Sequence, residues 1–489
     1  MRKSVINFRP IARVVSILLC IVGAMMWTGL PFSLYYGEAL APLFLAGLTS
    51  VGAGGLFFLV KNPKGVPIRK REGYLIVALS WVAMVTFGML PYLYSGLFTS
   101  VPDALFETMS GMTTTGASVL QDIEKQTENL HGILYWRSLT QWIGGMGIIV
   151  LTVAVFPLLG IGGIELFAAE APGPTSDKLH PRISETAKRL WFIYVGLTVV
   201  LGVLLYFFGM TPYEAINHAL TTMATGGFST RNASAAAFSP AIQYLLILFM
   251  FFAGVNYTVL YLSFKRRWSE VWKSDELKAY IGLVAVLTAV ITAKIYLNTD
   301  VETFEPALRD SLFQVVSLIT TTGFVSADYS LWGTSAQLVV FVLLFLGACA
   351  GSTSGGIKLI RHLVFFKNSY LEFKRIVHPS AIIPLRINRE IVPGRIITHV
   401  FNFLLLYLMF FVVGSVCLAM MGLDFMTAIG AMATSLGNVG PGIGDVGPTD
   451  NFAGLSDPIK LFLTFVMLVG RLEIFTVLVL FTPYFWRLN

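Results

Sequence analysis

DALFETMSGMTTTG, at residues 103–116, is the stretch that decides the fold of this chain. It recurs three times, aligned on its final glycine, as YEAINHALTTMATG at 213–226, DSLFQVVSLITTTG at 310–323 and DFMTAIGAMATSLG at 424–437. Each stretch is too apolar for a simple loop and too short to cross a bilayer, which requires about 20 residues. Repeats separated by roughly 100 residues indicate that whole structural modules are repeated.

The composition places the chain in a membrane. Of its 489 residues, 55% are hydrophobic and only 12% are charged, whereas soluble domains carry about 25% charged residues. In a membrane protein, the formal net charge of +7 is interpreted by which loops carry the basic residues. It is not the signature of a nucleic-acid-binding surface, so nucleic acid is excluded as a partner. The cysteines Cys20, Cys349 and Cys417 lie in separate apolar stretches and are too few for a disulfide framework or a cysteine-based metal site.

Apolar runs long enough to span a bilayer lie on both sides of these stretches. The charged residues before the first run resemble the start of a signal peptide, but the run is too long and lacks a cleavage site, so we expect it to remain in the chain. The ten runs are at residues 14–36, 39–60, 74–96, 133–157, 190–209, 242–264, 277–297, 338–366, 396–421 and 459–481.

The predicted fold class is an all-α polytopic membrane protein with ten transmembrane helices. An N-terminal helical hairpin precedes four span–pore-helix–span repeats, which together form a pseudo-tetrameric pore. The expected boundaries are 1–72 for the hairpin and 73–178, 179–275, 276–385 and 386–489 for the four pore modules. The basic residues concentrate on the side of the membrane that holds both termini, and we therefore expect both termini to be cytoplasmic.

A glycine turn at membrane depth can perform only a narrow range of chemistry, because unpaired carbonyls there must face protein or a water-filled cavity. Glycine permits the positive φ that lets consecutive carbonyls turn inward and replace the hydration shell of a monovalent cation. A single Thr-Gly pair is usually an ordinary turn, but four in register favour a pore. The preceding helices are expected to begin near Asp103, Glu214, Asp310 and Asp424 and to point their negative C-terminal ends at the cation.

Two other classes of protein fit less well. An enzyme would need a convergent nucleophile or metal set, whereas the histidines lie scattered without the spacing of metal ligands. A Na⁺- or H⁺-coupled secondary transporter would be expected to use inverted repeats and buried carboxylates. These repeats share one polarity and the spans hold few Asp or Glu residues, so the coupled transporter is kept as the alternative.

The four loops resemble the selectivity loops of the Trk/Ktr/HKT potassium-transporter superfamily. The resemblance covers nearly the whole chain and rests on TTTGAS at 113–118, ATGGFS at 224–229, TTTGF at 320–324 and SLGNVG at 435–440. With its extra hairpin, the chain is similar to the bacterial TrkH/TrkG-like branch. The implied K⁺ filter residues are Thr114, Thr115, Gly116, Ala224, Thr225, Gly226, Thr321, Thr322, Gly323, Ser435, Leu436, Gly437 and Asn438.

The same resemblance implies a cargo, a location and partners. It implies uptake of K⁺ and Rb⁺ across the bacterial inner membrane by a multi-pass protein in contact with lipid, without a covalently bound cofactor. It also implies a homodimer and a cytosolic TrkA-like nucleotide-binding ring that regulates it.

The segment GACAGSTSGG at 347–356 is a poor helix interior, because each glycine costs about 1 kcal/mol relative to alanine. We expect the helix to break there beside a cavity below the filter. The spacing of Gly347, Gly351 and Gly355 also suits a close helix contact, which is the alternative. The resemblance places an intramembrane gating loop at this point, and the implied gate includes Gly356.

Arg471 lies within the last predicted span, where a charge costs about 2.5–3.5 kcal/mol or more and needs a partner. Glu473 is two residues away and so is not on the same helix face. Arg471 is either a positive barrier in the conduction path or a tether to backbone carbonyls, and the resemblance favours a barrier that belongs to the gate. Lys358 is interpreted as a charge at the inner membrane interface.

Overall fold

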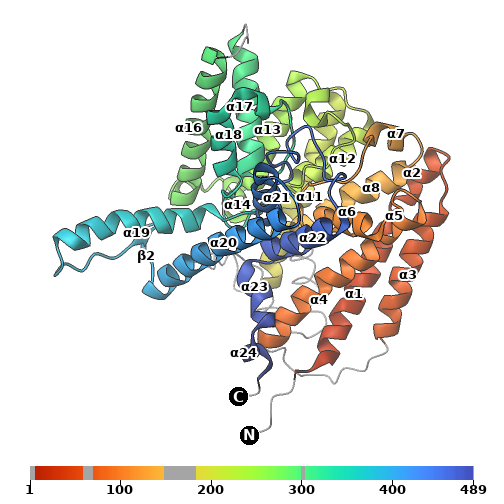
Figure 1. The fold of residues 1–489 in the computed structure, drawn as a ribbon, viewed down its shortest axis with the longest axis horizontal. Coiled ribbons are helices and arrows are strands. Elements are labelled where there is room, and N and C mark those ends of the chain that lie inside the picture. The colour runs from red at the N-terminus through yellow and green to blue at the C-terminus, as the bar shows by residue number, and fades with distance from the viewer. Residues whose placement is uncertain (1–5, 59–69, 148–182, 299–302, 488–489) are drawn as a thin grey trace.

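Long apolar helices account for most of the computed structural model, which describes residues 6–58, 70–147, 183–298 and 303–487 (Figure 1). Five helical segments are long and apolar enough to cross a membrane, and two sharply bent helix pairs raise the number to seven. The chain is therefore a multi-pass helical membrane protein. The five segments are Phe8–Tyr35, Arg71–Tyr94, Lys188–Phe207, Asp275–Leu297 and Gly394–Met420.

The first two long helices pack against each other. Helix α1 (Phe8–Trp27) packs along α3 (Ala41–Phe58), and both lie beside α4 (Lys70–Gly88) (Figure 1). The Ser50 hydroxyl donates to the Leu19 carbonyl at 2.8 Å. Small residues at this contact let the two helices approach closely.

Four short helices at the centre of the molecule correspond to the repeated stretches. They are α6 (Val101–Met112), α12 (Pro212–Met223), α17 (Phe304–Ile319) and α21 (Phe425–Gly437). Most of their residues are buried, including polar ones, as expected for helices enclosed by longer ones.

The starts of these helices agree only in part with the prediction. Asp424 caps α21 by accepting from the backbone N–H groups of Met426 and Thr427, and hydrogen bonds from Thr427 and Met426 lower the pKa of this carboxyl, which lies outside the spans. The prediction for Asp310 is wrong: α17 begins at Phe304, so Asp310 lies within the helix. Pro306 occupies the first turn, a position proline tolerates in a helix, and the apolar pattern does not reveal this earlier start.

The helices that follow the short ones are interrupted. The break predicted at 347–356 is confirmed, because residues 344–358 separate α18 (Thr334–Leu343) from α19 (Leu359–Val377) without forming a helix. The predicted runs 242–264 and 459–481 are also broken, which the sequence prediction missed. Helices α13 (Pro240–Gly254) and α14 (Tyr257–Phe264) meet at 106°, and α22 (Asp457–Arg471) meets the segment Ile474–Phe481 at 113°.

The run predicted at 133–157 is described only in part. Helix α8 (His131–Trp142) passes into a π-helical turn, η1 (Ile143–Gly147), and the rest of that run lies outside the described residues. The count of ten spans and the boundaries of the four modules stay predictions.

The remaining described elements include three of the long apolar helices, α11 (Ile183–Phe207), α16 (Asp275–Asn298) and α20 (Gly394–Met420), and the shorter elements between the helices. Helices α19 and α20 extend to one side of the molecule and are joined by a hairpin of β1 (Arg386–Ile387) and β2 (Glu390–Ile391) (Figure 1). The others are α2 (Leu30–Tyr35), α5 (Leu90–Tyr94), α7 (Ile123–Thr127), η3 (Ser234–Ala237), α15 (Trp268–Val271), η4 (Tyr329–Trp332), α23 (Ile474–Leu478), η5 (Val479–Phe481) and α24 (Pro483–Trp486).

Candidate functional site

The four loops after the short helices share one backbone conformation. In each loop, one residue has its N–H bonded to the carbonyl five positions earlier, at 2.8–3.0 Å. A non-glycine residue of positive φ precedes it, and a glycine of positive φ follows it. The four three-residue sets are 114–116, 225–227, 321–323 and 438–440.

This register corrects the sequence alignment in two loops. Gly227, with φ +79°, and Gly440, with φ +107°, are the equivalents of Gly116 and Gly323. Gly226 and Gly437, which the alignment placed there, are not. Gly226 lies one position earlier, and Gly437 is the last residue of α21. The second loop contains two consecutive glycines, and the fourth contains two glycines three residues apart. In each of these loops the sequence could be aligned on either glycine, and the backbone geometry identifies the equivalent one.

The four loops meet in a closed ring. A Cβ atom built on each of the four equivalent glycines would lie closer than 3.0 Å to a carbonyl oxygen of the next loop, a distance that real Cβ atoms essentially never show. These glycine and carbonyl pairs are Gly116 with Gly226, Gly227 with Thr322, Gly323 with Val439 and Gly440 with Thr115. The last pair returns to the first loop, so these contacts join four parts of one chain in a closed cycle.

The residues that precede these carbonyls are also buried. Thr114, Thr225, Thr321 and Asn438 are all 0% exposed. Asn438 donates to the Thr115 hydroxyl at 2.9 Å and to the Met467 carbonyl at 3.0 Å, which ties the fourth loop to the first loop and to α22. Ala224, Ser435 and Leu436 lie at or near the ends of the short helices, before the ring itself.

Helix α8 supports the first loop through a buried ion pair that the sequence analysis missed. Arg137 donates to Glu107 at 2.6 Å, and these side chains are 3% and 0% exposed. Glu107 also accepts from the Val119 N–H at 2.8 Å and from the Ser118 hydroxyl at 2.9 Å. A carboxylate at membrane depth followed by an arginine in the next span was the available signal, because such charges require partners.

Residues 344–358 contact the ring from the side where the short helices end. The Gly355 N–H donates to the Thr321 hydroxyl at 2.6 Å. The Thr353 hydroxyl lies 3.2 Å from the Met223 carbonyl at the end of α12. The Cys349 N–H donates to Gly254 at the break of the preceding module. The broken segment is thus held against parts of the second and third modules.

Lys358, for which a charge at the inner interface was expected, is buried within the protein. It is 5% exposed, and its ammonium donates to the carbonyl and hydroxyl of Ser354 within the same segment. The segment folds back on itself, and the residue after the break is carried inward.

Arg471 makes the contacts of a tether. Its guanidinium donates to the carbonyls of Thr353 at 3.0 Å, Gly144 at 2.6 Å and Gly145 at 2.8 Å. It thereby joins the end of α22 to the broken segment and to the π-helical turn. Glu473 accepts from Arg361 at 2.8 Å. Gly144 and Gly145, which looked like part of an ordinary span, gain a role because their carbonyls are freed at an irregular turn.

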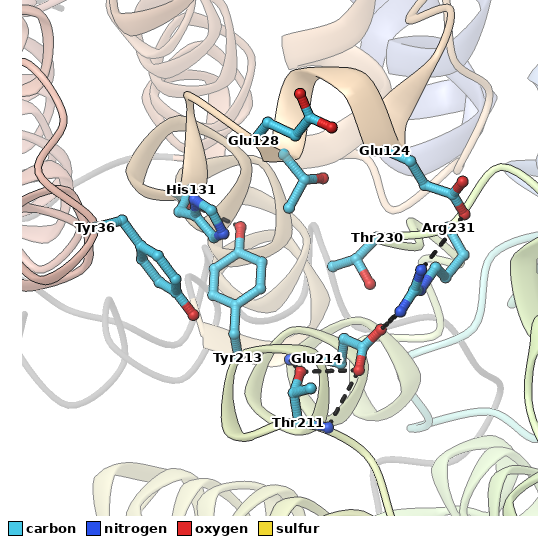
Figure 2. A pocket seen from close by; sticks show the side chains of 10 residues that line it. Tyr36, Glu124, Glu128, His131, Thr211, Tyr213, Glu214, Thr230 and Arg231 are labelled. Carbon is cyan, nitrogen blue, oxygen red and sulfur yellow. Dashed lines mark hydrogen bonds and ion pairs between the residues drawn. The ribbon is translucent and has the colours of Figure 1, made fainter.

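A pocket of about 360 Å³ lies beside the start of α12 and is lined by residues that include His131, Glu214 and Arg231 (Figure 2). Glu214, at the start of α12, pairs with Arg231 at 2.7 Å, and Tyr36 stacks on His131. None of the loop residues lines this pocket. Among the described residues, no group of three His, Cys, Asp or Glu side chains could hold a metal ion.

Comparisons with known proteins show the family of this chain. The model of the family TrkH, described as cation transport protein, matches residues 44–487. The Trk system potassium uptake protein TrkH of Salmonella typhimurium is 39% identical, over 98% of this chain and 100% of its own length. The corresponding TrkG of Escherichia coli is 34% identical, over 98% of this chain and 99% of its own length.

A solved structure extends the agreement to the fold. The crystal structure of the potassium transporter TrkH from Vibrio parahaemolyticus is similar with a TM-score of 0.87 and 36% identity, covering 98% of this chain and 100% of that one. The fold and these matches define a membrane transport protein for cations and not an enzyme. The chain belongs to the TrkH family.

Proposed function

We propose that this protein takes up K⁺ across the bacterial inner membrane through a filter made of the four converging loops. The observation that carries the proposal is the closed ring, because backbone carbonyls around one axis can replace the hydration shell of K⁺. The relatives named above are potassium uptake proteins. The proposed filter glycines are Gly116, Gly227, Gly323 and Gly440, which share a positive φ.

The same proposal includes a gate below the filter, made of residues 344–358 and Arg471. In support, this segment reaches Thr321 of the filter through Gly355, and Arg471 holds it through Thr353. A cation leaving the filter on this side would meet the segment and the guanidinium. The charge would repel the cation strongly where the local dielectric is low.

The arrangement in the membrane is proposed from the loops and from the family. Ten spans, two in the hairpin and eight in the four modules, follow from the apolar runs. The cytoplasmic position of both termini follows from the basic segments. A homodimer surrounded by lipid and a TrkA-like nucleotide-binding ring on the cytoplasmic side follow from the resemblance. The TrkA-like partner would shift residues 344–358 between a closed and an open position.

Uptake of radioactive Rb⁺ into vesicles that contain the purified protein tests the filter. We expect K⁺ and Rb⁺ to compete and Na⁺ and Li⁺ to compete weakly. Gly116→Ser should weaken this preference, because a side chain at φ +82° would be strained and would push against the Gly226 carbonyl. Equal uptake of K⁺ and Na⁺ by the unmutated protein would refute the filter.

The same vesicles separate a pore from a coupled transporter. Rb⁺ uptake that follows its own gradient, unchanged by an imposed Na⁺ or H⁺ gradient, supports the pore. Uptake that requires an inward gradient of the second ion would support the alternative of a Na⁺- or H⁺-coupled transporter.

A further inference from the structure

Four equivalent residues, one from each loop, provide the carbonyls of the ring, and only one of the four is a glycine. The equivalent residues are Thr115, Gly226, Thr322 and Val439. The Thr115 hydroxyl bonds to that of Thr113 at 2.7 Å, and the Thr322 hydroxyl bonds to that of Thr320 at 2.8 Å. Val439 packs in the core with 0% exposure. These three side chains stabilise the loops that carry them, whereas Gly226 has no side chain that could stabilise the second loop.

The Gln141 side chain occupies the space that a side chain of Gly226 would fill. A Cβ atom built on Gly226 would lie closer than 3.0 Å to the carboxamide of Gln141. Gln141 comes from α8, one helical turn beyond Arg137, so the same helix face supports the first and second loops. The side chain is 0% exposed.

The carboxamide bonds to both ends of a flexible segment. Its Nε2 donates to the Gly226 carbonyl at 2.6 Å, and its Oε1 accepts from the Phe228 N–H at 3.1 Å. Gly226 and Gly227 lie between these bonds, and two consecutive glycines have more conformational freedom than any other pair. The two bonds therefore fix the orientation of a peptide group whose oxygen belongs to the ring.

We propose that Gln141 is a positioning residue that determines cation specificity, because it holds the Gly226 carbonyl at the distance that suits K⁺. The inference rests on the proposed filter. Without the carboxamide, the Gly226–Gly227 peptide can rotate, and a ring with one mobile oxygen can contract around a smaller ion. The discrimination against Na⁺ then falls, while the other three carbonyls still admit K⁺.

The test compares Gln141→Met with Gln141→Glu in vesicles of the purified full-length protein. Methionine keeps the length of the side chain without a donor, and glutamate keeps an acceptor for Phe228 but offers no amide donor to Gly226. The measured quantity is the ratio of K⁺ to Na⁺ uptake, each as competition with radioactive Rb⁺. This ratio does not depend on how many molecules are folded. We expect it to fall about tenfold in both variants.

Gln243→Met is the matched control. Gln243 is also a buried glutamine, 4% exposed, and its Nε2 donates to the carbonyls of Ala235 and Phe238, which lie outside the ring. This variant loses the same kind of bond in the neighbouring loop and should keep the unmutated ratio.

An unchanged ratio in both Gln141 variants would overturn the inference. If the uptake of both ions also fell in equal proportion, Gln141 would be a structural residue only. An unmutated protein that does not distinguish K⁺ from Na⁺ would instead refute the proposed filter, whatever the Gln141 variants do.

Discussion

Removing the Arg471 side chain should open the proposed gate. Among the described residues, Arg471 donates to Gly144 and Gly145 of the π-helical turn and to Thr353 of the broken segment. The bond to Thr353 is therefore one of the contacts that hold the segment closed. A hydrogen bond from a charged group contributes about 1.5–3 kcal/mol. Because a tenfold change in an equilibrium corresponds to about 1.4 kcal/mol, the open population should rise roughly 10- to 150-fold in Arg471→Ala.

The assay is Rb⁺ uptake per folded molecule in vesicles that contain no cytosolic partner, together with thermal unfolding in detergent. Arg471→Lys distinguishes charge from tethering, since lysine keeps the charge but cannot hold carbonyls on two segments with a planar fork. A smaller increase in Arg471→Lys than in Arg471→Ala is expected. Arg361→Ala removes a guanidinium that pairs with Glu473 and leaves the Thr353 bond in place, so its uptake should not rise.

The opposite result would contradict this reasoning. If Arg471→Ala is less stable and takes up less Rb⁺ per folded molecule, the three carbonyls left without a donor are the dominant effect. Arg471 would then hold the helices together without controlling the ion path.

Three further outcomes are expected. Shortening the segment 347–356 should raise Rb⁺ uptake and leave the ratio of K⁺ to Na⁺ uptake unchanged. If the shortened protein inserts normally and its Rb⁺ uptake is unchanged, the segment only packs against its neighbours and is not a gate. Glu107→Gln should lower the unfolding temperature, since Arg137 would remain buried without its ion-pair partner at a cost of roughly 3–5 kcal/mol; an unchanged unfolding temperature would argue against a stabilising pair. Gly227→Ala should abolish Rb⁺ uptake in folded protein, because its φ of +79° and the adjacent Thr322 carbonyl leave no place for a methyl group; normal uptake would reject the register.

The sequence was most informative where one physical requirement dominates. Hydrophobic length alone predicts helices such as α16 and α20, and the cost of several glycines in one helix predicts the break at 347–356. The four loops were found because apolar stretches that are too short to cross the bilayer recur with a glycine at the end. Each of these features depends on the local sequence only.

Features that depend on distant contacts could not be predicted in this way. The register of the second and fourth loops is set by hydrogen bonds to the short helices, and the glycines alone allow two choices. The bend between α13 and α14 follows a single glycine, Gly254, and Asn256 at this bend caps α14 by accepting from the Thr258 N–H. The inward position of Lys358 depends on the folding of the whole segment.

The closed ring has a consequence for how this protein can vary. Its four quarters are encoded at separate places in one gene, so a point mutation alters one quarter of the proposed coordination shell and leaves three intact. In a pore built from four identical chains, the same mutation would appear four times. A single-chain ring can therefore change its preference for ions in small steps, and it can contain a support such as Gln141 in one quarter that the other quarters do not repeat.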